Sequence, residues 1–146
     1  MLPQLKTTVA LNNTSYTAAQ TSASSPIDTI GYDWCTVDII AATSNVVSNV
    51  PTVCKLQEAD VTNASSFADI AAFATPSPMP NANTAATAVL QNNYKFNVDC
   101  RARKRYLQVV FAPATTQVTT IIANLGRGEI APITAAKANS MTLTEG

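Results

Sequence analysis

Tyr94-Lys-Phe-Asn-Val-Asp-Cys100 and Tyr106-Leu-Gln-Val-Val-Phe-Ala112 are the two stretches that decide the fold. In both, every second residue is apolar. The apolar faces consist of Tyr94, Phe96, Val98 and Cys100 in the first stretch and of Leu107, Val109 and Phe111 in the second. A period of two residues is typical of a β-strand that buries one face. The two stretches therefore predict two strands joined by the turn 101–105.

Three more stretches outward from this pair have strand character. Tyr32–Ala42 alternates in the same way, Thr52–Glu58 does so more weakly, and Gln117–Asn124 is rich in β-branched residues. Gly126 and Gly128 are expected to break the last strand. About six or seven short strands separated by turn residues predict an all-β fold, an antiparallel β-sandwich or barrel with extended N- and C-terminal arms.

Two segments of the middle region are less clear. Phe67–Phe73 fits a short helix, since Phe67, Ile70 and Phe73 share a spacing of three, but its β-rich neighbours and the resemblance described below favour a strand. Thr75–Ala88 contains three prolines, which exclude the interior of a sheet. We expect a loop there.

Both ends of the chain are expected to lie outside a central domain. We predict an extended N-terminal arm over residues 1–26, a β-sandwich domain over 27–134 and a C-terminal extension over 135–146. A frayed N-terminus and an arm that becomes ordered on a partner both fit the composition. In the second interpretation, removal of residues 1–12 leaves the fold intact and weakens binding. The arm's candidate partner contacts are its spaced apolar residues Leu2, Leu5, Val9 and Leu11.

The composition favours a structural or binding module. Only 12% of the 146 residues are charged and the formal net charge is zero, so no long-range field attracts nucleic acid or anionic lipid. No segment approaches the 18 apolar residues of a membrane helix, and the first residues lack the features of a signal peptide. We therefore expect synthesis in the cytoplasm, with no nucleic-acid or membrane partner.

The residue types needed for catalysis are largely missing. The chain has no histidine, which removes the commonest general base and metal ligand. Cys35, Cys54 and Cys100 are scattered and odd in number, so we expect three reduced thiols that bind no metal. Gly126-Arg-Gly128 lacks the Lys-Ser/Thr ending of a phosphate-binding loop. We predict no enzyme activity, no catalytic residues and no cofactor.

The strongest local feature is the basic turn, which contains four of the nine basic residues. A solvated turn, a polar or acidic protein partner and single-stranded nucleic acid are three interpretations of such a cluster. Zero net charge argues against the third. The candidate contact residues of this turn are Arg101, Arg103, Lys104 and Arg105.

Tyr32 and Trp34 offer a different possibility. Two residues apart on one strand, they share a face and could form a platform on which a sugar stacks. Core packing is the other use of two such rings. Open exposure of both rings is the observation that separates these interpretations.

Four motifs together resemble a known family. They are Thr52-Val-Cys-Lys-Leu-Gln-Glu-Ala-Asp60, Ser66-Phe-Ala-Asp-Ile70, Arg103-Lys-Arg-Tyr-Leu-Gln-Val-Val110 and Leu125-Gly-Arg-Gly-Glu-Ile-Ala-Pro132. In this order they resemble small proteins encoded beside the major capsid protein of tailed phages, across roughly residues 30–132. Ala59 stands where that family has Ser.

The resemblance implies a head decoration, or cement, protein. Such a protein binds the major capsid protein on the outer surface of the virion and stabilises the shell, often as a homotrimer. The family has no catalytic residues to transfer. A sugar-binding β-sandwich on a virion surface and a neck or tail component are the alternative functions.

Overall fold

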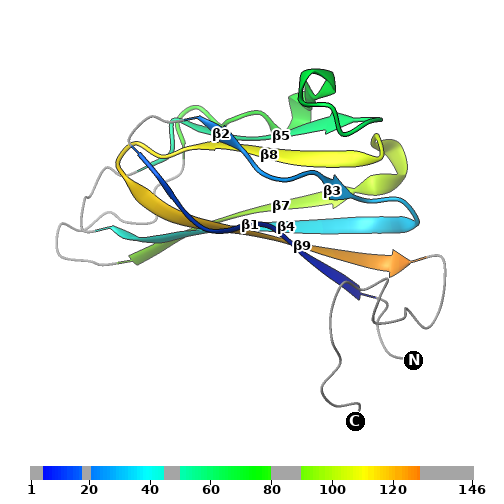
Figure 1. The fold of residues 1–146 in the computed structure, drawn as a ribbon, viewed down its shortest axis with the longest axis horizontal. Coiled ribbons are helices and arrows are strands. Elements are labelled where there is room, and N and C mark those ends of the chain that lie inside the picture. The colour runs from blue at the N-terminus through cyan, green and yellow to red at the C-terminus, as the bar shows by residue number, and fades with distance from the viewer. Residues whose placement is uncertain (1–4, 18–20, 45–49, 80–89, 129–146) are drawn as a thin grey trace, which may run out of the picture.

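The structure is a computed structural model that describes residues 5–17, 21–44, 50–79 and 90–128. Within these residues the regular structure is β-strand apart from three single-turn 3-10 helices, and the strands form two sheets packed face to face (Figure 1). The prediction of an all-β antiparallel sandwich is confirmed.

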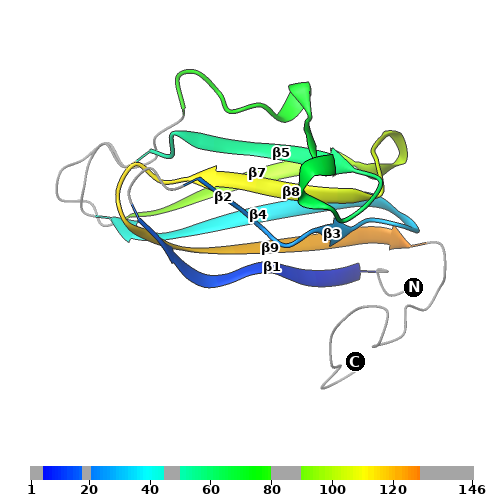
Figure 2. The same ribbon diagram turned by 45° about the horizontal axis from the view of Figure 1, so that its top comes forward.

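Sheet A has four long antiparallel strands, visible side by side in Figure 2. In spatial order they are β1 (Leu5–Tyr16), β9 (Gln117–Gly128), β4 (Tyr32–Ser44) and β7 (Leu90–Asp99). Sheet B is built around β8 (Tyr106–Ala112), which pairs with β5 (Val53–Ala59) on one side and with two short strands on the other. Its short strands are β2 (Ser22–Ala23), β3 (Ile27–Asp28) and, beyond β5, β6 (Ala68–Asp69).

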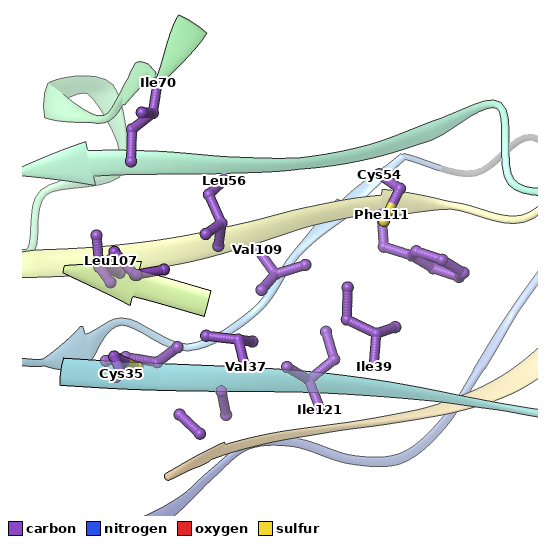
Figure 3. Packing of buried hydrophobic residues seen from close by; sticks show 14 of the residues in the cluster. Cys35, Val37, Ile39, Cys54, Leu56, Ile70, Leu107, Val109, Phe111 and Ile121 are labelled. Carbon is purple, nitrogen blue, oxygen red and sulfur yellow. The ribbon is translucent and has the colours of Figure 1, made fainter. Parts of the chain in front are cut away.

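The core lies between the sheets and consists of the alternating residues that the sequence indicated. Cys35, Val37 and Ile39 of β4 face Leu107, Val109 and Phe111 of β8, and all six are almost completely buried (Figure 3). Full burial of one large apolar side chain contributes about 1.5–3 kcal/mol. Strands β4 and β8 therefore face each other across the core. Strands β7 and β8, which are consecutive in the sequence, belong to opposite sheets.

The chain itself closes the two long sides of the sandwich. On one side, Ser24 N donates to Val109 O (2.8 Å) and Ser25 N donates to Ala10 O (2.9 Å), which connects sheet B to β1. On the other, residues 70–75 run along β5. Ile70 N donates to Leu56 O (3.1 Å), and Cys54 N donates to Thr75 Oγ1 (3.0 Å).

The segment Phe67–Phe73 is only partly a strand, so the strand prediction is wrong for most of it. Ala68–Asp69 is β6, and Ala71–Phe73 is the 3-10 turn η2. Pairing with β5 stops after two residues because the chain turns inward and buries Ile70. The Phe73 ring then packs edge-on against Phe96, 5.8 Å away.

The N-terminal arm is not separate from the sandwich, so the boundary predicted at residue 26 is wrong. Residues 5–16 are β1, which pairs with β9 along its length, and Ala10 and Tyr16 are buried. The strand was hidden in the sequence because its register shifts twice, between Val9 and Leu11 and between Leu11 and Thr14. Such irregularities interrupt the two-residue period.

The break expected at Gly126 and Gly128 is also wrong. Strand β9 continues to Gly128, since Gly126 pairs with Leu5 on one side and with Trp34 on the other. Glycine usually weakens a strand interior, but here β9 is paired with a strand on each side. The C-terminal extension 135–146 and the larger part of the loop Thr75–Ala88 lie outside the described residues.

Candidate interaction surface

The possible metal ligands and the thiols of the described residues can be placed directly. No three His, Cys, Asp or Glu side chains of this part of the chain could hold a metal ion together. The three cysteine thiols are free and buried. Over the described ranges, no helix has the length and hydrophobicity that crossing a bilayer requires.

The basic turn lies at one end of the sandwich, where β7 passes through the 3-10 turn η3 (Cys100–Ala102) into β8. Each of its four cationic side chains forms an ion pair with a different carboxylate. The ion pairs are Arg101–Asp99 (2.6 Å), Arg103–Glu58 (3.7 Å), Lys104–Asp60 (3.7 Å) and Arg105–Asp28 (2.8 Å).

Two of these pairs have fork geometry. Arg101 donates from Nε (2.9 Å) and Nη2 to the carboxylate of Asp99, which also accepts from the backbone N–H of Arg101. These hydrogen bonds lower the pKa of Asp99 to about 2. The Arg105 guanidinium likewise lowers the pKa of Asp28. The cations therefore connect three strand ends, and each cation of this turn is matched by a carboxylate.

Tyr32 and Trp34 do not form an open platform. The Arg101 guanidinium lies over the Trp34 ring at 5.3 Å from its centroid, and Lys6 Nζ lies 5.9 Å from the Tyr32 centroid. Tyr32 packs partly against the core. A stacked sugar needs free ring faces, so this geometry gives no support to the sugar-binding alternative.

Among the described residues, no other element covers the outer face of sheet A. Strand register places its outward side chains in rows that cross all four strands, because residues opposite each other point to the same side. The three rows are Leu5–Gly126–Trp34–Asp99, Thr7–Asn124–Thr36–Asn97 and Val9–Ile122–Asp38–Lys95.

The three rows differ in chemistry. The middle row is neutral and pairs within itself, since Thr7 Oγ1 donates to Asn124 Oδ1 (2.9 Å) and Thr36 Oγ1 to Asn97 Oδ1 (3.3 Å). In the outer rows, Leu5 and Val9 are each 53% exposed and Trp34 is 40% exposed. Each outer row also contains one carboxylate, and each carboxylate is paired with a cation.

The outer face of sheet B contrasts with this. There Lys55 and Gln57 of β5 both donate to Asp69 (2.7 Å each), and Gln108 of β8 donates to Ser24 O (2.6 Å). Val110 on the same face is buried. Among the described residues, these polar groups of sheet B bond within their own sheet, whereas sheet A exposes apolar side chains beside one neutral polar row.

The partner-contact residues predicted from the sequence lie in several different places in the structure. Leu5 and Val9 lie exposed on the outer face of sheet A, Leu11 packs against the core, and Leu2 lies outside the described residues. Arg101 reaches the corner of this face over Trp34. The other basic candidates, Arg103, Lys104 and Arg105, lie at the end of the sandwich in ion pairs.

Most residues of this surface were not predicted from the sequence. Ile122, Asn124 and Gly126 belong to it only because β9 lies between β1 and β4. This strand order places residues side by side that are more than 80 positions apart in the sequence. No local sequence pattern predicts such a neighbourhood.

No protein-family model matches the chain, and no curated protein matches it. The family assignment therefore stays a prediction from the resemblance, and the fold and the surface carry the functional argument.

Proposed function

We propose that the chain is a structural subunit of a tailed-phage virion, a head decoration protein that binds the major capsid protein on the outside of the shell. The observation that carries this proposal is the open outer face of sheet A, which presents Leu5, Val9 and Trp34 beside one neutral, internally paired polar row. Such a face suits a protein surface better than a small molecule or a polyanion.

The dimensions of the face favour many copies acting together. Four strands about 4.8 Å apart and 10–13 residues long give a flat face of roughly 700 Å². A stable protein–protein interface buries about 800 Å² per partner. One such face does not exceed this area, and we propose that the chain acts as a homo-oligomer, with the trimer implied by the resemblance, so that avidity adds to each contact.

Stabilisation of the shell follows from mass action. A subunit that bridges neighbouring capsid proteins binds the assembled shell and not the free capsid protein. It therefore shifts the equilibrium toward the intact shell by an amount that grows with occupancy. This role requires no catalytic group.

The test compares shells with and without the chain. Shells lacking it should assemble but should rupture at a lower temperature and after milder removal of divalent ions, and adding the purified protein should restore their resistance. Equal rupture temperatures would contradict the cement role. Electron microscopy of the restored particles separates the alternatives, since a neck or tail component would add density only at one vertex.

A further inference from the structure

Two of the three cysteines lie together in the core beside the basic turn. Cys35 of β4 pairs in register with Val98, and Trp34 pairs with Asp99, so Cys100 follows directly on the neighbouring strand. Both side chains point inward, with 1% of Cys35 and 7% of Cys100 exposed. Each belongs to the same buried cluster.

The two cysteine side chains are neighbours across the β4–β7 pair. The Cys100 thiol donates to Val98 O (3.9 Å), and Val98 is the residue directly opposite Cys35 in the sheet. Interaction with Cys100, together with burial, raises the pKa of Cys35. Cys100 is the more exposed of the two, so it is the thiol that an oxidant would meet first.

Cys54 provides the comparison. It is as buried as Cys35, with 1% exposed, but lies on β5 in the opposite sheet. Burial raises its pKa to about 12, and no thiol contributes to that shift. The chain therefore contains two thiols that are neighbours across one strand pair and a third buried thiol in another environment.

We infer that Cys35 and Cys100 form a disulfide when the folded protein meets a hydroperoxide. The Cys100 thiolate attacks one peroxide oxygen, the O–O bond breaks, and Cys100 becomes a sulfenic acid while hydroxide leaves. The Cys35 sulfur then attacks the Cys100 sulfur and displaces the second oxygen. In total two thiols and one hydrogen peroxide give one disulfide and two waters.

Such a bond would fix the basic turn to sheet A. The 3-10 turn η3, which begins at Cys100, also contains Arg101, whose guanidinium lies over Trp34 on the outer face. A covalent link to β4 would therefore hold one corner of the proposed interface in place. The chain would be reduced when made and would acquire the link after release into an oxidising medium.

The test uses the intact, folded, reduced protein and hydrogen peroxide, and is independent of shell binding. After unfolding without reductant, one of the three thiols should react with an alkylating agent. Mass spectrometry should find the loss of two hydrogen atoms and a peptide linked through Cys35 and Cys100. Dithiothreitol should restore both thiols.

Two variants complete the design. Cys54→Ser should still form the link, whereas Cys100→Ser should keep both of its remaining thiols or lose them only to irreversible oxidation. A link that involves Cys54, three thiols that persist in the wild-type protein, or thiol loss that dithiothreitol does not reverse would each overturn the inference.

Discussion

Gly126 occupies the point on the outer face of sheet A where Leu5 and Trp34 approach from the neighbouring strands. A Cβ at this position would lie 3.5 Å from Leu5 Cδ2, which is ordinary contact, and the described glycine with positive φ is Gly31 instead. The position therefore accepts a side chain without backbone strain. Any side chain there projects from the face.

Gly126→Gln should consequently weaken binding without unfolding the protein. We expect shell affinity to fall at least about tenfold, equal to about 1.4 kcal/mol, since the added side chain holds the partner away from the flat face. The thermal midpoint of the free protein should stay close to that of the wild type. Gly126→Ala, which adds only the Cβ, is the control and should bind nearly normally. Normal binding by Gly126→Gln would place the contacts elsewhere.

The carboxylates Asp28 and Asp99 make stability depend on pH in the acid range. Their arginine partners lower the pKa of both groups, that of Asp99 to about 2. An unfolded aspartate has a pKa of about 3.9. Each pair therefore contributes its full stability above the unfolded pKa and loses it as pH falls through the folded pKa.

The thermal midpoint should accordingly be flat between about pH 7 and pH 5 and should fall between about pH 4 and pH 2. Asp28→Asn should show a lower midpoint at neutral pH and a smaller loss in acid, because Arg105 no longer has a carboxylate to release. Thermal denaturation followed by circular dichroism across this range measures both effects. An equal acid loss in the variant and the wild type would mean that this pair contributes nothing.

At the scale of the strands, predictability from sequence depended on regular alternation. Strand β8 spans the predicted Tyr106–Ala112, and the inward faces of β4 and β8 are the predicted ones. Strand β1 was missed because two register shifts, together with the left-handed conformation of Asn13 (φ 42°), break its period. Pairing with β9 makes this segment a strand. A short stretch of sequence contains no information about pairing with so distant a segment.

The correction at β1 changes what truncation does. Deletion of residues 1–12 removes most of the strand, including buried Ala10, and leaves β9 with an unpaired edge. We expect a thermal midpoint lower by about 3–8 °C, as a loss of about 1–2 kcal/mol gives in a domain of this size, and a tendency to aggregate through the exposed edge. Differential scanning calorimetry and light scattering measure these two effects.

Deletion of residues 1–4 alone is the matched control, since it leaves β1 whole. Its thermal midpoint should stay at the wild-type value. A chain that lacks residues 1–12 but melts at the wild-type temperature would show that β1 is an independent arm after all.

For the whole molecule, the fold class could be predicted from the sequence, whereas the interaction surface could not. Alternation in single strands is enough to predict two packed β-layers. The choice of which outer face stays open depends on the order β1-β9-β4-β7, on residues 70–75 running along β5, and on the ion pairs that neutralise the basic turn. The spacing of Leu5 and Val9 drew attention to the right strand, but only the three-dimensional register joined them to Trp34 and Ile122.

The central claim is that the outer face of sheet A binds the shell, and one pair of substitutions tests it most directly. Val9 lies on that face and Val61 lies in the turn after β5, and the two are alike in type and exposure, at 53% and 54%. Each is replaced by Asp, and the occupancy of both variants on shells that lack the protein is measured by sedimentation and gel densitometry. Val9→Asp should lose most of its occupancy, because docking would bury an unpaired carboxylate, while Val61→Asp should bind as the wild type does. Equal occupancy of the two variants, or loss confined to Val61→Asp, would contradict the account.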